Sequence, residues 1–311
     1  MPMQFSQLIF GTWFDDVLPA TAVGQWIFGL GGDDEITSNF DRTMLFGGWG
    51  DDNLRTEVDI TTSDTQPIKV SAVQFGGFGD DEMTVVLSAV GNGPAETFAY
   101  IDGGRGNDTI SVNAFADGAS GSGPDARVEN VVYGGSGNDT IDVVASVSAS
   151  GQVAAVNRIY GGSGNDIINA VAEIISNFGG GDNPVENIID GGCGDDQIFA
   201  RAETDFNGSD GTARNDIRGG HGNDTIIAEA IANSNDGLFA INELDGGKGN
   251  DVLHAFALTD SNSSSPVGSN ILYGRSGKDV LTAEHFTDGE NWVTTVDNFL
   301  DGGAHDDVMT A

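Results

Sequence analysis

The amino-acid sequence predicts an all-β fold, a solenoid of parallel strands with one tight turn in each coil of about 28 residues. Three observations predict this fold. One glycine-aspartate motif recurs along the chain, an alternating apolar pattern follows each copy, and a second short strand pattern precedes each copy.

The motif is clearest in YGGSGNDTIDV at residues 133–143, and it returns as IDGGRGNDTI at 101–110 and IRGGHGNDTI at 217–226. Its first glycine stands at positions 11, 29, 47, 76, 103, 134, 161, 191, 219, 246, 274 and 302. Two steps of 18 residues precede steps of 27 to 31 residues. We therefore expect one solenoid domain over residues 1–311, with short coils over 10–46 and long coils over 47–311.

Each coil carries two strand patterns around the motif. The segment after the motif alternates with period two, as in Ile141, Val143 and Ala145, which predicts a strand with one small apolar face. The segment before the motif reads Asn-x-apolar-x-Gly, and its asparagine shares parity with the inward apolar residue. We expect an inward ladder of amides that hydrogen-bond from coil to coil, although ordinary turn asparagines are the alternative. The ladder would contain Asn130, Asn157, Asn187, Asn215, Asn242, Asn270 and Asn298.

Polar segments of variable length join the two strands of a coil, as in DGASGSGPDAR at 117–127 and DSNSSSPVGS at 260–269. In a repeat architecture such insertions gather on one side of the stack. We expect that side to lie opposite the regular turns.

Composition limits the partners. The chain has 47 glycines and a net charge of -36, so nucleic acid and anionic membranes would be repelled at long range. Cations are the favoured partners. The hydrophobic content of 38% can form a core once this charge is neutralised, so we expect folding to depend on cations.

The chain shows no features of a small disulfide-linked domain or of membrane insertion. Cys193, the one cysteine, has no internal disulfide partner and is expected to be exposed. The stretch MPMQFSQLIFGTWFDD lacks the features of a cleaved signal peptide, and no run of 18 apolar residues predicts a membrane span.

The motif has the chemistry of a calcium site. Its glycines permit positive φ and direct backbone carbonyls at one point, which the sixth-position carboxylate can also reach. Calcium takes six to eight oxygen ligands, so two stacked turns would share one ion, with roughly ten ions per chain. The predicted ligands are Asp16, Asp34, Asp52, Asp81, Asp108, Asp139, Asp166, Asp196, Asp224, Asp251, Asp279 and Asp307, with the first-position glycines Gly47, Gly76, Gly103, Gly134, Gly161, Gly191, Gly219 and Gly246. Weaker sites could use the fifth-position residues Asp33, Asp51, Asp80, Asp195 and Asp306.

In these motifs the chain resembles the RTX (repeats-in-toxin) family of secreted Gram-negative bacterial proteins, from Phe10 to Met309. The resemblance implies a right-handed β-roll, export in the unfolded state through a type I system, and folding outside the cell at millimolar calcium. One departure is that RTX blocks place nonapeptides nine residues apart, with two calcium turns per coil. Here each coil keeps one turn, so we expect one calcium column.

Other sites are disfavoured by the sequence. The four histidines do not cluster and no HExxH occurs, so we expect no enzyme. Trp13, Trp26, Trp49 and Trp292 could form a sugar-stacking surface, but three lie in the first fifty residues, which favours packing of the short coils. The varied third motif position argues against a flat ice-binding array.

We expect a secreted structural protein that stacks head to tail into a filament, sheath or surface matrix, because neither end of the sequence carries a capping pattern. A contact with a cell surface or polysaccharide is also predicted. The alternatives are a calcium-binding module of a secreted enzyme or adhesin, and an adhesin whose loops bind sugar. The closing DDVMTA resembles a type I secretion signal, but it is equally the next repeat.

Overall fold

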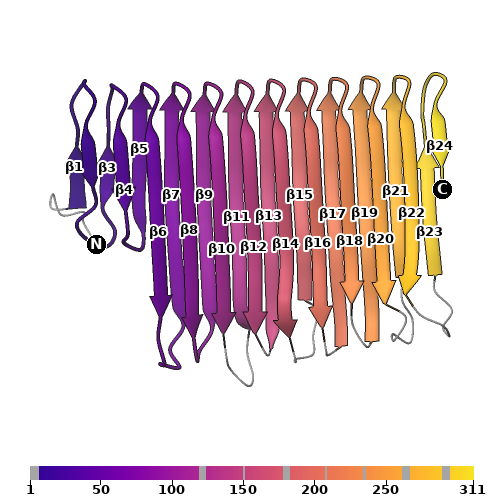
Figure 1. The fold of residues 1–311 in the computed structure, drawn as a ribbon, viewed down its shortest axis with the longest axis horizontal. Coiled ribbons are helices and arrows are strands. Elements are labelled where there is room, and N and C mark those ends of the chain that lie inside the picture. The colour runs from indigo at the N-terminus through magenta and orange to yellow at the C-terminus, as the bar shows by residue number, and fades with distance from the viewer. Residues whose placement is uncertain are drawn as a thin grey trace.

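The fold is an elongated stack of flattened coils (Figure 1). The computed structural model describes residues 7–118, 124–149, 151–177, 183–206, 209–233, 236–260, 267–288 and 295–311. These residues form two parallel sheets of twelve strands each and no α-helix. No helix able to cross a membrane occurs among them. The predicted all-β solenoid is confirmed.

The odd-numbered strands form one sheet, called sheet A here, and the even-numbered strands form the other, called sheet B. Successive strands of a sheet are next-but-one in sequence, because each coil contributes one strand to each sheet. The strands are β1 (Leu8–Phe10), β2 (Val17–Pro19), β3 (Trp26–Phe28), β4 (Glu35–Ser38), β5 (Thr43–Trp49), β6 (Asn53–Thr61), β7 (Ile68–Phe78), β8 (Glu82–Gly91), β9 (Ala95–Arg105), β10 (Thr109–Gly118), β11 (Pro124–Ser136), β12 (Thr140–Ala149), β13 (Gln152–Ser163), β14 (Ile167–Asn177), β15 (Asn183–Cys193), β16 (Gln197–Phe206), β17 (Ser209–His221), β18 (Thr225–Asn233), β19 (Asp236–Lys248), β20 (Val252–Asp260), β21 (Val267–Ser276), β22 (Val280–Asp288), β23 (Thr295–Asp301) and β24 (Val308–Thr310).

The glycine-aspartate turns lie along one edge of the stack, and the described connections 62–67 and 92–94, which lead from sheet B back to sheet A, lie at the opposite edge (Figure 1). The turns are held in register by the sheet, since Gly104, Gly135 and Gly162 are aligned partners on β9, β11 and β13. The short strands β1 to β4 belong to the two 18-residue steps, and the longer strands follow. The predicted separation of turns and loops is therefore confirmed for the described connections, while much of the segments 117–127 and 260–269 lies outside the described residues.

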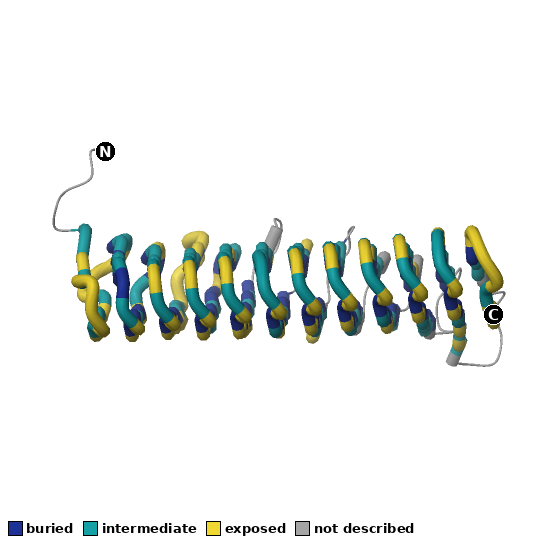
Figure 2. The backbone as a smooth tube through the Cα atoms, turned by 90° about the horizontal axis from the view of Figure 1, so that it is seen from above, coloured by how far each residue is buried: buried dark blue, intermediate teal, exposed yellow. Residues whose placement is uncertain are grey.

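The core is a thin layer between the two sheets, seen as the buried stripe along the stack in Figure 2. On β12, Ile141, Val143, Ala145 and Val147 are all buried, as the alternating pattern predicts. Alanine fills many inward positions, because the two sheets leave little volume between them.

The inward asparagine ladder is present. The Asn157 amide nitrogen donates to Asn187 Oδ1 at 2.9 Å and to the Val171 carbonyl of sheet B at 2.8 Å. The Asn187 amide repeats both bonds, to Asn215 Oδ1 and to the Arg201 carbonyl. The ladder therefore joins successive coils and also ties sheet A to sheet B.

An aromatic column covers part of the outer face of sheet A. Phe28 stacks on Phe46 with ring centroids 4.6 Å apart, and Phe46 stacks on Phe75 at 5.0 Å. The column continues through Tyr100 and Tyr133, with tilted rings. These rings cover one another across the strands and so stabilise the pairing of neighbouring coils.

Candidate metal centre

The turns require glycine because neighbouring coils approach closely there. Gly135 and Gly137 have φ of 114° and 125°, a region that other residues adopt only with strain. A Cβ on Gly135 would also overlap the carbonyl oxygen of Gly104 in the preceding coil. The glycines thus let each coil direct backbone carbonyls at the next one.

The sixth-position aspartates form a ladder of their own, and those from Asp34 to Asp279 are buried. Oδ1 of Asp139 accepts the backbone N–H of Asp108 at 2.8 Å, and the N–H of Asp139 is donated to Asp166 Oδ1 at 2.8 Å. The same bond joins every pair of successive turns, from Asp16 and Asp34 to Asp279 and Asp307. One carboxylate oxygen of each aspartate after the first is therefore fixed by the preceding coil.

The second carboxylate oxygen of these aspartates is the candidate metal ligand. Oδ2 is buried and has no hydrogen-bond partner among the described residues in Asp34, Asp52, Asp81, Asp108, Asp139, Asp166, Asp196, Asp224, Asp251 and Asp279. An orphaned, buried carboxylate oxygen carries a large desolvation cost unless a cation or a proton joins it. Ten successive turns share this deficit.

A backbone oxygen converges on the same place. The point that a Cβ of Gly134 would occupy lies 2.5 Å from Asp139 Oδ2 and 2.6 Å from the carbonyl oxygen of Gly161 in the next coil. Gly161 repeats this arrangement, with Asp166 Oδ2 at 2.5 Å and the Gly191 carbonyl at 2.6 Å. Two acceptors that meet without a donor favour a cation, and the oxygen-only donor set suits calcium.

The electrostatics of the turn column agree with this assignment. The pKa of Asp52 is raised to about 7 and that of Asp81 to about 8, chiefly by burial. Neighbouring aspartates contribute to the rise, and a backbone hydrogen bond to each carboxylate opposes it. Burial also raises the pKa of Asp139 and Asp196 to about 7. Without a cation, the coils therefore hold these carboxyls near the point of protonation at neutral pH.

Backbone oxygens must supply much of each coordination shell. Across the described ranges, no three His, Cys, Asp or Glu side chains converge in a metal-binding arrangement. Asp139, Asp166 and first-position glycine carbonyls offer oxygen ligands that suit a calcium ion shared by two coils, and the assignment of these residues as ligands stays a prediction. The number of ions stays a prediction.

The fifth motif position forms a second ladder that sequence reasoning missed. Oδ1 of Asp51 accepts the backbone N–H of Asp80 at 2.8 Å, and Oδ1 of Asp195 accepts that of Asn223 at 2.6 Å. These side chains bond toward the following coil, whereas the sixth-position aspartates bond toward the preceding one. The sequence does carry a signal for this ladder. The fifth motif position is Asp or Asn in every turn except the one that contains Lys278. Asp33, Asp51, Asp80 and Asp195 therefore already have a structural role.

The outermost turns differ from the rest. Oδ2 of Asp16 accepts the Thr12 backbone N–H at 2.6 Å and the Thr12 hydroxyl at 2.8 Å, so this carboxylate is satisfied within its own turn. Leu30 and Arg275 occupy the second motif position with φ of 83° and 72°, and His305 occupies the fourth with φ of 99°.

The remaining candidates stay apart from the turn column. Cys193 is exposed as predicted. Trp13 and Trp49 are exposed rather than packed inside the short coils, and Trp49 stacks on Phe78 at 4.1 Å. These two therefore do not fill the interior of the short coils, although each lies against a neighbouring coil, Trp13 beside Gly31 and Trp49 on Phe78. Trp292 lies outside the described residues. His254 lies 3.5 Å from Glu284 on sheet B, and His285 faces the space beside Gly268.

Comparison with known families agrees with the geometry of the turns. The family model described as the RTX calcium-binding nonapeptide repeat matches residues 100–118, 129–143, 155–170, 209–230, 236–257 and 267–284. All six matched segments span a complete glycine-aspartate motif, with strand residues on both sides of the turn. No curated protein matches the chain.

Proposed function

The chain is an RTX-type calcium-binding repeat protein, and on that premise we propose that it is a secreted structural element that folds when calcium fills its turn column. Calcium would be held by the sixth-position aspartates and the first-position glycine carbonyls of adjacent turns. It would supply the positive charge that the buried carboxylates lack. The protein's own contribution is a rigid scaffold, with no catalytic role.

The observation that carries this proposal is the run of ten buried, unpartnered Oδ2 atoms in successive turns. In the unfolded chain these oxygens are hydrated, and the coils that assemble a shared cage do not exist. The binding energy of the ions therefore contributes to the folding free energy. Each ion also joins two coils, so binding and stacking should be cooperative along the solenoid.

Secretion is proposed from the family and from charge. A net charge of -36 opposes collapse of the chain when calcium is scarce, and this suits export in an unfolded state. Where calcium is abundant, outside the cell, neutralisation would allow the core to form. A type I system without a cleaved signal peptide is the proposed route, and association with the cell surface is proposed as well.

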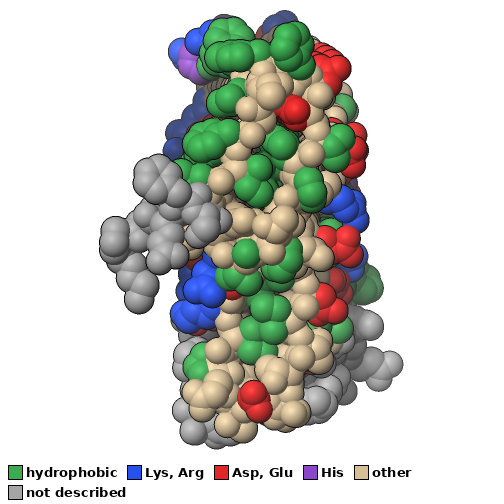
Figure 3. All heavy atoms as spheres, turned by 90° about the vertical axis from the view of Figure 1, so that its left-hand side faces the viewer, with side chains coloured by type: hydrophobic (Ala, Val, Ile, Leu, Met, Phe, Trp, Pro, Cys, Tyr) green, Lys and Arg blue, Asp and Glu red, His purple; other side chains and the backbone are tan. Residues whose placement is uncertain are grey.

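We also propose that folded molecules stack end to end. The end of the solenoid at β1 and β2 presents apolar side chains (Figure 3), and Phe10, Trp13, Phe14 and Val17 are exposed there. Among the described strands, β1 and β2 each have a single neighbour, so their outer edges have no strand paired to them. A second copy would cover this apolar face and continue both sheets.

The test is a calcium titration followed by circular dichroism and negative-stain microscopy, with magnesium as the control ion and a chelator as the reversal. Cooperative β-structure at millimolar calcium, with fibres growing from it, is the expected result. Discrete short rods would keep calcium-driven folding but overturn assembly, and would favour the alternative of a module accompanying a secreted enzyme or adhesin. β-structure that a chelator leaves unchanged would overturn the proposal as a whole.

A further inference from the structure

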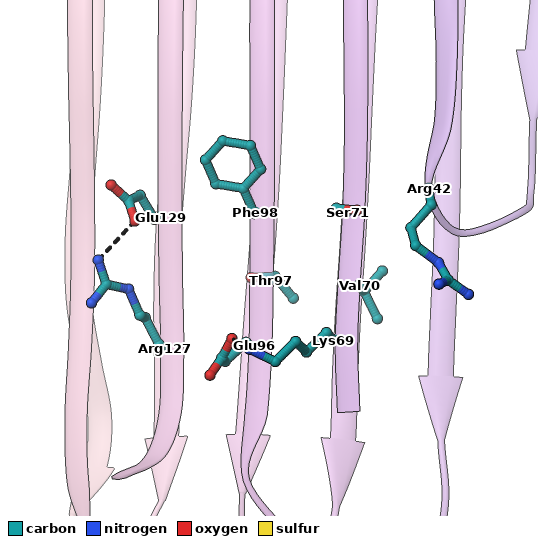
Figure 4. A pocket seen from close by; sticks show the side chains of 9 residues that line it. All are labelled: Arg42, Lys69, Val70, Ser71, Glu96, Thr97, Phe98, Arg127 and Glu129. Atoms are coloured by element: carbon teal, nitrogen blue, oxygen red, sulfur yellow. Dashed lines mark hydrogen bonds and ion pairs between the residues drawn. The ribbon is translucent and has the colours of Figure 1, made fainter. Parts of the chain in front are cut away.

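A hollow of about 320 Å³ opens on the outer face of sheet A, over β7, β9 and β11 (Figure 4). Two rows of outward side chains form its floor. Ser71, Phe98 and Glu129 are aligned partners in one row, and Lys69, Glu96 and Arg127 are aligned partners in the next. Arg42 closes the end beyond Ser71, where its backbone N–H bonds to the Ser71 carbonyl at 3.0 Å.

Phe98 gives the hollow an apolar platform. Phe98 is 38% exposed, and Figure 4 shows its ring face-on, with Glu129 on one side, Ser71 on the other and the pair of Lys69 and Glu96 below. The neighbour in register on one side is Ser71, whose small side chain does not cover the ring. This ring differs from the stacked aromatic column on the same sheet, where Phe46 lies between Phe28 and Phe75.

Cations gather around this platform. Arg42, Lys69 and Arg127 line the hollow, and each is paired with a carboxylate, that of Asp41, Glu96 or Glu129. Because Arg158 shares Glu129, four cations face three carboxylates here. These four are among only twelve basic residues in a chain of net charge -36. Such a local gathering of cations is not expected from the composition.

The cationic head groups are within reach of a ligand. The Lys69 and Arg42 side chains are about 70% exposed, and that of Arg127 is 51% exposed. Lys69 is paired with Glu96 at 2.5 Å and Arg127 with Glu129 at 2.7 Å. Glu129 also holds Arg158 at 2.6 Å, so one carboxylate serves two guanidinium groups. Exposed ion pairs of this kind are weak, and a ligand carboxylate can compete for the cations.

We propose that this hollow binds a carboxylate-bearing sugar ring of a glycan. The C–H face of the ring would lie on Phe98, and the carboxylate would be bound by Lys69, Arg127 or Arg42. The volume is at the small end of the range for ligand sites, which suits one ring with its substituents.

The surroundings favour this ligand class over an acidic peptide or a polyanion. The face of a paired sheet offers no free backbone donors, so an extended peptide cannot bind here as an added strand. A ligand with many charges would be repelled by the acidic surface around the hollow. An isolated acidic sugar needs only one cationic side chain to bind its carboxylate and one apolar platform for its ring.

The inference rests on the proposed function only in requiring stacked coils, and it does not require end-to-end assembly. It names the residues that would form the polysaccharide contact predicted from the sequence. The test uses the calcium-loaded full chain, with folding of every variant checked by circular dichroism. Methyl glucuronide, methyl glucoside and a hexaglutamate peptide are titrated as probes by ligand-observed nuclear magnetic resonance.

The glucuronide should bind at least tenfold more tightly than the glucoside. Phe98→Ala should weaken glucuronide binding at least fivefold, and Lys69→Ala combined with Arg127→Ala should remove the preference for the charged sugar. The matched controls are Phe239→Ala on the same sheet and Arg55→Ala on sheet B, which should leave binding unchanged.

Equal binding of both sugars, tighter binding of the peptide, or glucuronide binding that survives Phe98→Ala would each overturn the assignment. The last result would show that the sugar binds without the Phe98 ring. A wild-type chain that folds with calcium but binds no probe would overturn this inference alone. A chain whose fold does not respond to calcium would overturn the proposed function instead.

Discussion

The central turns, from Gly47 to Asp251, and the four outer turns use the same motif in different ways. In the central turns glycine fills positions one, two and four, and every sixth-position Oδ2 is buried without a partner. In the first turn Thr12 satisfies the Asp16 carboxylate with two hydrogen bonds. In the second, eleventh and twelfth turns Leu30, Arg275 and His305 stand at positive φ.

The difference shows what each part of the motif is for. Where a turn has a coil on both sides, carbonyls from the neighbours occupy the space of any Cβ, and the buried carboxylate needs a cation. The first turn has a described neighbour on one side only, and its carboxylate is satisfied by ordinary hydrogen bonds. The need for a cation is therefore a property of the stack. It should be weaker in the first turn than in the ten turns from Asp34 to Asp279, whose Oδ2 atoms are buried without a partner.

The largest expected effect comes from pH in the absence of calcium. Burial raises the pKa of Asp52 and Asp139 to about 7 and that of Asp81 to about 8, above the value near 4 of an unfolded aspartate. The folded state then binds more protons than the unfolded state between these values, so its stability falls as pH rises through this window. In chelator, β-structure should be greatest near pH 4.5 and largely lost at pH 8.5, as measured by circular dichroism.

A matched pair of variants separates this effect from the reduction of overall charge. Asp139→Asn removes a buried carboxylate from a central turn, whereas Asp64→Asn removes an exposed charge from a loop. In chelator at pH 7.5 the first should raise the content of β-structure more than the second. Equal effects would mean that general charge repulsion, and not burial in the turns, opposes folding.

A Cβ in a central turn should have the next largest effect. Gly135→Ala places it at φ 114° and against the Gly104 carbonyl, so we expect a loss of about 3 kcal/mol or more of unfolding free energy in saturating calcium. Ser136→Ala, at the variable third position of the same turn, should change it by less than about 0.5 kcal/mol. Urea unfolding measures both, and similar losses would contradict the packing argument.

Removal of single carboxylates should then sharpen the contrast between turns. In calcium, Asp139→Asn weakens a site that two coils share, and the calcium midpoint of folding should rise severalfold. Asp16→Asn should shift the midpoint less than twofold, because Thr12 already satisfies the carboxylate that it replaces. A larger shift for Asp16→Asn would show that the first turn also depends on calcium.

Much of the fold could be predicted from the sequence because one signal was repeated twelve times. Parity along the strands placed Asn187 and its equivalents inside, and the structure confirms their ladder. The bond from each amide to the opposite sheet, such as Asn187 to the Arg201 carbonyl, could not be predicted. It depends on how far apart the sheets lie, which no single repeat encodes.

The site was predicted by type but not in its detail. The sixth-position aspartates were identified from their fixed spacing, yet both carboxylate oxygens of Asp139 looked alike in sequence. The two oxygens become different only when the coils stack. Oδ1 then accepts the Asp108 N–H, and Oδ2 is left without a partner. The hollow around Phe98 was also missed, because Lys69, Phe98 and Arg127 lie on three different coils whose loops differ in length.

The smallest expected effect tests the strain in an outer turn. Arg275 has φ of 72°, its guanidinium bonds to Asp245 at 2.7 Å, and it lies over the Tyr273 ring at 4.4 Å. Arg275→Ala and Arg275→Gly both remove these contacts, but only glycine also relieves the left-handed backbone. The glycine variant should therefore be more stable than the alanine variant by about 1 kcal/mol. If urea unfolding in calcium gives equal stabilities, the outer turns carry no strain and their departure from glycine reflects relaxed geometry. If the difference exceeds that between Gly135 and Gly135→Ala, the outer turns constrain the backbone as tightly as the central ones, and the contrast between the two regions fails.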